Sequence, residues 1–251
     1  MPRLIVLGSA SAVPSETQEN THMALAGDSR RVLVDTGHNP IVRLGQAGLD
    51  PVGITDLVLT HFHPDHASGA ASLLMNTWLL GRKEPLRVYG LAYTLDRMEQ
   101  VMDLYDWGDW PGMYPVEFVR IPEQELSPVL ESDELRIFAS PVQHLIPTIG
   151  LRFEFPHSGK TLAYSCDTEP SPVVVRLAQG ADALIHEATG PWKGHTPAAQ
   201  AGEIARQAGG KQLYLIHYHL GERQPQDLIQ EARETFQGPV DLATDLMEIA
   251  F

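Results

Sequence analysis

The chain has 251 residues, is 43% hydrophobic, and carries 18 basic against 32 acidic residues, for a formal net charge of −14. This length and apolar content allow one full hydrophobic core, so we expect a single domain over residues 1–251. The acidic balance argues against a nucleic-acid partner, because binding a polyphosphate backbone normally requires a basic patch, and the densest basic clusters here are only Arg30-Arg31 and Arg82-Lys83.

The single cysteine, Cys166, excludes an internal disulfide framework and is consistent with a reducing compartment. Met-Pro-Arg leads directly into an expected strand at residues 4–8, which leaves no room for a signal peptide. No apolar run approaches the length of a membrane span. We therefore expect a cytoplasmic protein without a membrane partner.

The sequence pattern predicts a group of strands followed by strands that alternate with helices, and this order occurs twice along the chain. Short apolar segments bounded by turn residues predict the strands, which we place at residues 4–8, 23–27, 31–35, 56–60, 86–90, 116–121, 135–140, 149–155, 162–166, 183–186, 213–217 and around 246–251. Longer segments predict helices at residues 41–47, 67–80, 93–104, 173–179, 198–208 and near 227–235. Strand pairs flanked by helices place the chain in the α/β (α+β) class.

The most informative segment follows the expected strand at residues 56–60 and has the sequence His61-Phe-His63-Pro-Asp65-His66. Three imidazoles and a carboxylate within six residues are hard to explain as core packing, since these groups are rarely buried unless they are paired or metal-bound. Both types suit zinc and similar cations. Side chains two positions apart in an extended segment point the same way, so His61 and His63 can bind one ion. Asp65 and His66 can then bind a second ion beside it. The alternative is a solvated polar loop.

This segment matches the His-x-His-x-Asp-His signature of the metallo-β-lactamase superfamily, which the chain resembles. Further family ligands have candidates in the expected order, each at the end of an apolar strand, where sites often gather: His144, Asp167 and His217. The resemblance implies a four-layer αββα metallo-β-lactamase sandwich. It also implies the ligand sets: His61, His63 and His144 for one ion, Asp65, His66 and His217 for the other, and Asp167 as the bridge.

We expect two Zn²⁺ ions per chain, although Mn²⁺ or Fe²⁺ also suits such a site. Two ions close together can clamp a phosphoryl or acyl oxygen and generate hydroxide near neutral pH. By resemblance, Asp65 also hydrogen-bonds the attacking water as general base or orienter. Cys166 is not a family ligand at its position, and we interpret it as a small strand residue.

Two later segments resemble the ribonuclease Z branch of the superfamily: a literal His-Glu-Ala-Thr at residues 186–189, and His195-Thr-Pro at the start of a helix. The resemblance implies that Glu187 and His195 form a pair near the scissile phosphate and that His195 donates a proton to the leaving oxygen. An imidazole suits that role because its pKa lies near neutrality. For Glu187 the alternative is a solvated strand end.

The departures from ribonuclease Z concern tRNA binding. In that branch a long arm between the equivalents of His144 and Asp167 grips the tRNA, whereas here only 22 residues intervene and predict a plain hairpin. The segment after His217 lacks the Ser and the Arg-Tyr pair expected there, and Cys166 stands where the family has Gly. These changes leave the expected metal ligands in place, but they argue against recognition of tRNA.

We therefore expect a dinuclear metal-dependent hydrolase, a phosphodiesterase acting on a small or cyclic phosphodiester, with nucleic acid disfavoured as a partner. The alternatives are tRNA 3′ processing as in ribonuclease Z, hydrolysis of a lactone or thioester, and a non-hydrolytic metal-binding protein. Redox di-iron members of the superfamily would be expected to carry Glu within the first motif, where His63 stands. We also expect a homodimer.

Two features have more than one interpretation. The aromatic segment at residues 105–114, Tyr-Asp-Trp-Gly-Asp-Trp-Pro-Gly-Met-Tyr, fits a pocket wall, a subunit interface or local packing. Asp35, which ends an expected strand beside the site, fits either a group that steadies the metal-binding loop or a helix cap.

Overall fold

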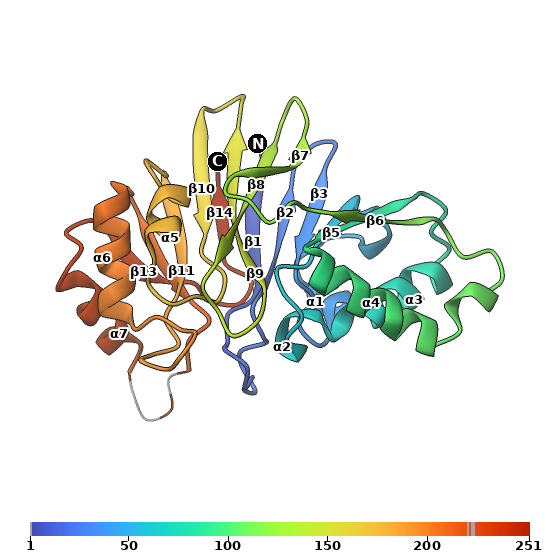
Figure 1. Cartoon of the computed structure of the whole chain (residues 1–251), viewed down its shortest axis with the longest axis horizontal. Coiled ribbons are helices and arrows are strands. Elements are labelled where there is room, and N and C mark those ends of the chain that lie inside the picture. The colour runs from blue at the N-terminus through green and yellow to red at the C-terminus, as the bar shows by residue number, and fades with distance from the viewer. Residues whose placement is uncertain (1, 220, 222–223) are drawn as a thin grey trace.

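The computed structural model describes residues 2–219, 221 and 224–251 and forms four layers. Two seven-stranded sheets pack face to face at the centre, and helices cover the outer face of each (Figure 1). The αββα sandwich is therefore confirmed. The N-terminal and C-terminal strands lie next to each other in one sheet, so both ends of the chain reach the same edge of the molecule.

The first sheet has the strand order β14-β1-β2-β3-β4-β5-β6. Its strands are β1 (Arg3–Gly8), β2 (His22–Ala26), β3 (Arg31–Val34), β4 (Asp56–Val58), β5 (Leu86–Gly90), β6 (Val116–Arg120) and β14 (Glu248–Ala250). The pairs from β14 to β3 are antiparallel and those from β3 to β6 are parallel. The parallel strands need crossover connections, which the helices of this half provide.

The second sheet repeats this plan with the order β13-β12-β11-β10-β9-β8-β7. Its strands are β7 (Ser127–Glu131), β8 (Arg136–Val142), β9 (Thr148–Phe155), β10 (Lys160–Tyr164), β11 (Ala183–Glu187), β12 (Leu213–Ile216) and β13 (Val240–Leu242). The pairs from β7 to β10 are antiparallel and those from β10 to β13 are parallel. Two similar halves were predicted from the sequence, and the structure confirms them.

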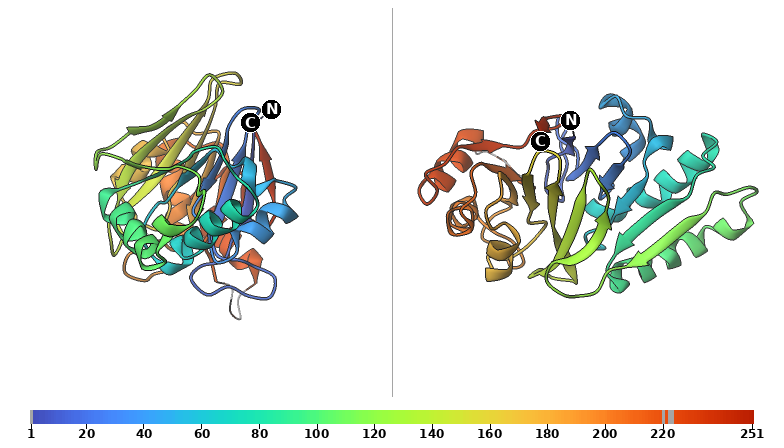
Figure 2. Two further views of the ribbon diagram at one scale, coloured as in Figure 1. Left: turned by 90° about the vertical axis from the view of Figure 1, so that its right-hand side faces the viewer. Right: turned by 90° about the horizontal axis from the view of Figure 1, so that it is seen from above.

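The outer layers consist of short helices (Figure 2). Those on the first sheet are α1 (Pro40–Gln46), α2 (Pro64–Ala67), α3 (Gly69–Leu79) and α4 (Ala92–Leu104), with the 3₁₀ turns η1 (Pro51–Gly53) and η2 (Trp107–Asp109). Those on the second sheet are α5 (Pro172–Leu177), α6 (Ala198–Ala208) and α7 (Pro225–Arg233). Among the described helices, none has the length and apolar character needed to cross a membrane.

The central core lies between the two sheets, where alternate residues of each strand interdigitate. Leu4 and Val32 from the first sheet belong to the same apolar cluster as Ile137, Leu151 and Phe153 from the second. All five side chains are at most 1% exposed. This packing holds the strand ends of both sheets in fixed positions and so fixes the loops that follow them.

Replacing Phe153 with alanine is expected to lower the free energy of unfolding by about 3–5 kcal/mol, because it removes a fully buried ring from this core and leaves a cavity. Denaturant titration of both proteins measures the change. Leu104, which is 82% exposed, provides the control: Leu104→Ala should change stability by less than about 0.5 kcal/mol. Similar values for the two variants would contradict the assigned core.

Three local expectations differ from the structure. The edge strands β7 and β13 were not predicted, because their segments, Ser-Pro-Val-Leu-Glu and Val-Asp-Leu, carry only short, interrupted apolar patterns. The helix expected at residues 67–80 is two helices, the first of which starts at Pro64. The strand expected at residues 56–60 ends at Val58, so the loop that carries the first motif begins earlier.

Candidate metal centre

The seven predicted ligands lie together at one edge of the sandwich, in the segments that follow the C-terminal ends of strands; Asp65 and His66 lie in the short helix α2 and the other five in loops. They are His61, His63, Asp65 and His66 after β4, His144 after β8, Asp167 after β10, and His217 after β12. The last three do not end their strands as expected but follow the final strand residue by one to three positions. His217 has a φ of 52°, so the chain turns sharply at this ligand.

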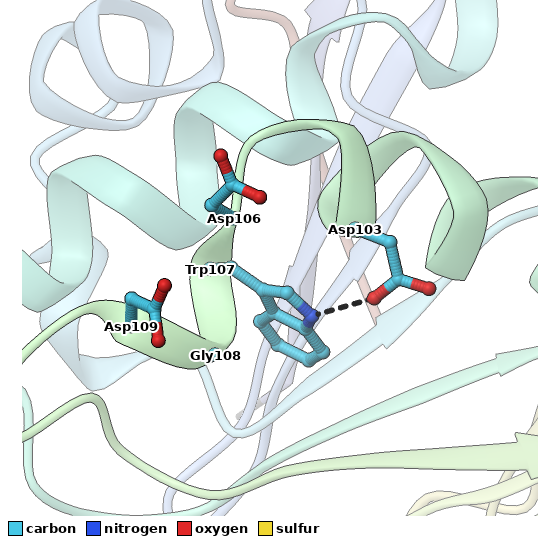
Figure 3. A pocket seen from close by; sticks show the side chains of 5 residues that line it. All are labelled: Asp103, Asp106, Trp107, Gly108 and Asp109. Carbon is cyan, nitrogen blue, oxygen red and sulfur yellow. Dashed lines mark hydrogen bonds between the residues drawn. The ribbon is translucent and has the colours of Figure 1, made fainter.

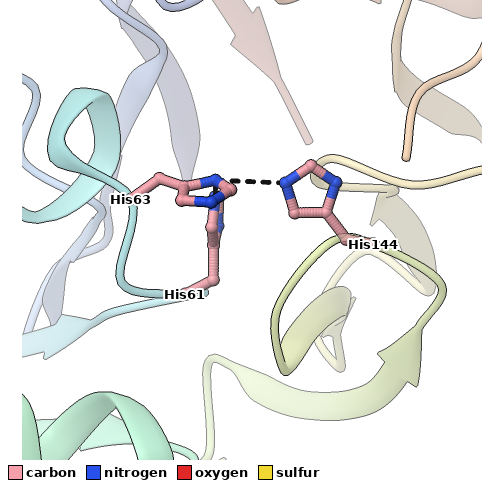
Figure 4. Close-up of side chains that lie close together, drawn as sticks. All are labelled: His61, His63 and His144. Atoms are coloured by element: carbon pink, nitrogen blue, oxygen red, sulfur yellow. Dashed lines mark hydrogen bonds between the residues drawn. The ribbon is translucent and has the colours of Figure 1, made fainter. Parts of the chain in front are cut away.

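One group of donors consists of His61, His63 and His144, whose donor atoms lie within 4.8 Å of one another (Figure 4). His63 Nδ1 lies 3.1 Å from His61 Nε2 and 3.1 Å from His144 Nε2. The two histidines of the first motif thus point the same way, as their spacing predicts, and the third approaches from the other sheet. Three imidazoles converging on one point are a common cation-binding arrangement.

A second group consists of Asp65, His66, Asp167 and His217. His217 Nε2 lies 3.3 Å from both His66 Nε2 and Asp65 Oδ2. Asp167 Oδ2 lies 3.5 Å from His217 Nε2, 3.9 Å from His144 Nε2 and 4.0 Å from His61 Nε2. Asp167 therefore lies between the two groups, where a bridging ligand would be required.

Outer hydrogen bonds fix the orientation of the histidines on the first sheet. Asp35 is fully buried, and its Oδ2 lies 2.8 Å from His66 Nδ1 and accepts a bond from Thr60 Oγ1. Because the Thr60 hydroxyl donates to Asp35, it accepts from His61 Nδ1, 3.1 Å away. Both Nδ1 atoms therefore carry hydrogen, and both Nε2 atoms present lone pairs to the centre. Asp35 orients a predicted ligand and does not cap a helix.

The histidines on the second sheet are oriented in the same way. His144 Nδ1 donates to the carbonyl of Gly194 at 2.7 Å. Thr189 Oγ1 donates to the carbonyl of His217 and accepts from the Nδ1 of the same residue, both at 2.8 Å. Their Nε2 atoms consequently also present lone pairs to the centre.

The protonation states of the side chains in the centre favour the binding of cations. Burial lowers the pKa of His61 well below its ordinary value and also lowers the pKa values of His63 and His144, so these rings stay neutral. Burial acts to raise the pKa of Asp167, but the positive charges of His217 and His66 outweigh it and hold that pKa well below its usual range. The neutral rings of His61, His63 and His144 beside the Asp167 anion are a donor set typical of divalent metal sites.

The residues present therefore fit a pair of divalent cations. The buried Asp167 Oδ1 lies 3.5 Å from His66 Nε2 and has no partner at a normal hydrogen-bond distance, which is costly for a carboxylate oxygen unless a cation supplies one. Burial opposes protonation of His66, yet the charges of Asp167 and Asp35 raise its pKa well above the ordinary value. The negative charges of Asp167 and Asp35 therefore favour a positive charge between them. A metal ion bound by the histidine nitrogens that face the centre would provide this charge.

Asp35→Asn is expected to weaken metal binding by about 10- to 100-fold, because the amide loses the charge that orients and polarises His66. Competition with a chromophoric chelator measures the affinity. Asp28, an exposed acid on the β2–β3 turn, serves as control, and Asp28→Asn should leave the affinity unchanged. An unchanged affinity for Asp35→Asn at intact secondary structure would mean that this carboxylate does not support the site.

Glu187 and His195 form a pair at the side of the centre. His195 Nδ1 lies 3.0 Å from Glu187 Oε1. The fully buried Glu187 also accepts bonds from the backbone nitrogens of Thr168 and Thr189, both at 3.0 Å. A ring nitrogen of His195 lies within 4.8 Å of donor atoms of His144 and Asp167. Glu187 is thus not a solvated strand end, and it holds the imidazole next to the predicted metal ligands.

Burial acts to lower the pKa of His195, but the hydrogen bond and charge of Glu187 outweigh it and raise the pKa above the ordinary value. The ring can therefore hold a proton near neutral pH, which a general acid requires. The neighbouring His186 lies on the opposite face of β11, since successive strand residues alternate. Its Nδ1 donates to the carbonyl of Glu187, and it does not join the centre.

The comparisons with known proteins agree with this geometry. Residues 30–218 match the family model described as the beta-lactamase superfamily domain, which covers most of the chain. The chain belongs to the beta-lactamase superfamily.

Relatives of this superfamily member cover its whole length. Ribonuclease Z from Methanothermobacter thermautotrophicus is 28% identical over 99% of this chain and 96% of the relative. Among solved structures, the metallo-beta-lactamase fold protein YhfI from Bacillus subtilis has a TM-score of 0.84 at 20% identity, covering 99% of this chain and 98% of that one. A protein described as a new diphosphatase from the PhnP family has a TM-score of 0.77 at 19% identity, covering 100% and 98%.

These findings confirm the resemblance to the ribonuclease Z branch and make this superfamily member a metal-dependent hydrolase that binds divalent metal. The alignment with the archaeal relative extends over 305 positions, so that protein has insertions for which this chain has no residues. Residues 145–166 of this chain contain the hairpin of β9 and β10 and no arm, as the sequence predicts.

Several supporting groups were missed at the level of sequence. Thr60 looks like the last residue of an apolar strand and Gly194 like an ordinary loop residue, and neither residue type indicates a hydrogen bond to a histidine of the centre. Cys166 lies just after β10, with its Sγ 3.6 Å from the outer nitrogen Nδ1 of His61. Burial raises the pKa of this thiol well above its usual range, and its sulfur lies beside the outer nitrogen of His61 rather than the Nε2 that faces the centre.

Proposed function

We propose that the protein is a dinuclear zinc phosphodiesterase that hydrolyses a small or cyclic phosphodiester. The observation that carries this proposal is the Glu187–His195 pair, held beside two converging donor groups. A proton donor next to a metal centre is needed where an alkoxide leaves, and such leaving groups are typical of natural phosphodiesters.

Each residue has a defined role in this reaction. Bound divalent ions supply Lewis-acid stabilisation of the phosphoryl oxygens and lower the pKa of water. Burial acts to raise the pKa of Asp65, but the hydrogen bond to His217 and the charge of His66 hold it below the ordinary value, so Asp65 is an anion that can orient and deprotonate the attacking water. His195 Nδ1 is fixed by Glu187, which leaves the proton on Nε2 for the leaving oxygen.

A small substrate is favoured because the residues between His144 and Asp167 form a hairpin and no long arm. The hairpin at residues 148–164 provides no extension that could reach the body of an RNA, and the net charge of −14 repels a polyanion. Similarity to proteins named ribonuclease Z and diphosphatase favours attack at phosphorus over attack at carbon.

The second candidate is tRNA 3′ processing. The observation that favours it is the similarity to ribonuclease Z over nearly the full length of both chains. In this alternative the same residues act on a larger phosphodiester, and a local groove would have to replace the missing arm.

The test begins with protein freed of metal by a chelator and reconstituted with Zn²⁺ or Mn²⁺. Bis-p-nitrophenyl phosphate and p-nitrophenyl acetate share a leaving group, so their rates compare attack at phosphorus with attack at carbon. We expect metal-dependent turnover of the phosphodiester and slow turnover of the acetate. Rapid hydrolysis of the acetate without turnover of the diester would assign the protein to the lactone or thioester hydrolases instead.

A further inference from the structure

We infer that the substituent retained on phosphorus is an uncharged planar ring, which binds in an apolar pocket beside His63; this inference rests on the proposed phosphodiesterase function. The pocket has a volume of about 260 Å³, enough for a single ring system. It lies where the loop of the first motif meets α3 and α4 and is lined chiefly by Phe62, Pro64, Ala67, Ala71, Met98 and Val101, with Tyr105 at its edge.

The lining makes the pocket suitable for a neutral ring. Besides His63 and the hydroxyls of Ser68 and Tyr105, its side chains are apolar, and no Lys, Arg, Asp or Glu is among them. Phe62 and Tyr105 provide aromatic faces, and Met98 is a flexible apolar side chain that adapts to a ring. The pocket shares His63 with the predicted metal centre, so a group bound there lies next to the reacting phosphorus.

The pocket continues into a second hollow of about 290 Å³ towards the aromatic segment. The two hollows share Ser68, Ala71 and Tyr105, and the second reaches Trp110, whose ring stacks on Trp78 at a centroid distance of 5.1 Å. Tyr105 is 58% exposed, although it borders an apolar surface. Part of the segment at residues 105–114 is therefore a pocket wall, which was one of the three interpretations of its sequence.

The orientation of the substrate follows from the position of His195. This residue lines a separate hollow of about 540 Å³ with Glu169, Trp192 and Lys193, and the hollow shares no residue with the pocket beside His63. Met98 and Val101 of α4 line the pocket beside His63, and Gln200 of α6 lines the hollow at His195. These two helices lie on different halves of the sandwich (Figure 1). Because His195 protonates the leaving oxygen, the leaving group occupies its side, and the retained substituent occupies the apolar pocket.

Negative charge in and next to the aromatic segment disfavours an anionic substituent. Asp103, Asp106 and Asp109 surround a surface hollow with Trp107, whose Nε1 donates to Asp103 (Figure 3). This hollow shares no residue with the metal centre, and we assign it no ligand of its own. Its carboxylates would repel a nucleotide chain that extended past the two apolar hollows, whereas a neutral ring is unaffected.

Two substrates with one leaving group test the inference: phenyl p-nitrophenyl phosphate and methyl p-nitrophenyl phosphate, assayed with the zinc-reconstituted protein. We expect kcat/KM to be about tenfold higher for the phenyl ester, because the ring leaves water on binding. Val101→Trp fills the pocket and should bring the ratio close to one. Leu104→Trp places the same ring three residues further along α4, at a position that is 82% exposed and does not line the pocket, and should keep the wild-type ratio.

A ratio is unaffected by the fraction of folded protein, so misfolding of a variant does not imitate the result. Calorimetry with diphenyl and dimethyl phosphate gives an independent readout, and we expect tighter binding of diphenyl phosphate that Val101→Trp removes. Equal kcat/KM for both esters would overturn the pocket assignment while leaving the phosphodiesterase proposal intact. No turnover of either ester would instead contradict the proposed function. If Val101→Trp changed the oligomeric state but not the ratio, the pocket would be a subunit contact, and the inference would be wrong.

Discussion

Asp65→Ala is expected to lower kcat for bis-p-nitrophenyl phosphate by about 10³-fold, the range seen when a positioned base is lost. Asp65 Oδ2 lies 3.3 Å from His217 Nε2 and 3.4 Å from His66 Nε2, so the carboxylate belongs to the second donor group and faces the centre. Its removal takes away the anion that orients water and one predicted ligand at the same time. Steady-state kinetics with bound metal quantified in each preparation measures the loss.

Two further variants sharpen this prediction. Asp65→Asn keeps the volume but removes the charge, and it should be impaired to a similar degree. Asp96, an exposed acid on α4 paired with Arg120, is the control, and Asp96→Asn should retain wild-type activity. Activity of Asp65→Ala above about a tenth of wild type would contradict a role for this carboxylate in the reaction.

His195→Ala is expected to slow the hydrolysis of diesters with poor leaving groups by about 10²- to 10⁴-fold and that of nitrophenyl esters far less. An alkoxide needs a proton as it leaves, whereas nitrophenolate is stable without one. The hydrogen bond to Glu187 both orients the ring and raises its pKa, so Glu187→Gln should show the same selectivity with a smaller loss. A series of aryl and alkyl diesters, plotted against the pKa of the leaving group, measures the effect.

The control for this series is His157, an exposed histidine in the turn between β9 and β10, and His157→Ala should follow the wild-type line. Loss of His195 should steepen the dependence of rate on leaving-group pKa. If the plots of rate against leaving-group pKa were parallel for wild type and His195→Ala, His195 would not be the general acid. It would then at most position the substrate.

The donor set could be predicted from sequence because four of its members occur within one short motif and the other three follow apolar strands. A metal site needs several such side chains at one point, and the C-terminal ends of strands bring distant residues to one edge of a sheet. The apolar patterns of the segments also predicted the two similar halves, each with strands followed by alternating strands and helices. The prediction failed for the edge strands β7 and β13, whose apolar patterns are short and interrupted.

The supporting groups could not be predicted because they act through tertiary contacts. The Gly194 carbonyl reaches His144 across 50 positions of sequence, and the Thr60 hydroxyl depends on Asp35 for its orientation. Hydroxyls and carbonyls are so common in loops that no pattern marks these ones. The apolar pocket is similarly invisible in sequence, since it combines Phe62 from the motif with Met98 and Val101 from α4.

The most direct test of the central claim compares a small phosphodiester with a pre-tRNA that carries a 3′ trailer, using the same zinc-reconstituted protein. Turnover of bis-p-nitrophenyl phosphate with an intact pre-tRNA is the predicted result, because the catalytic groups are present and the residues between His144 and Asp167 form only a short hairpin. Clean cleavage of the pre-tRNA at its 3′ end would contradict the account and would show that an RNA can be held without the arm.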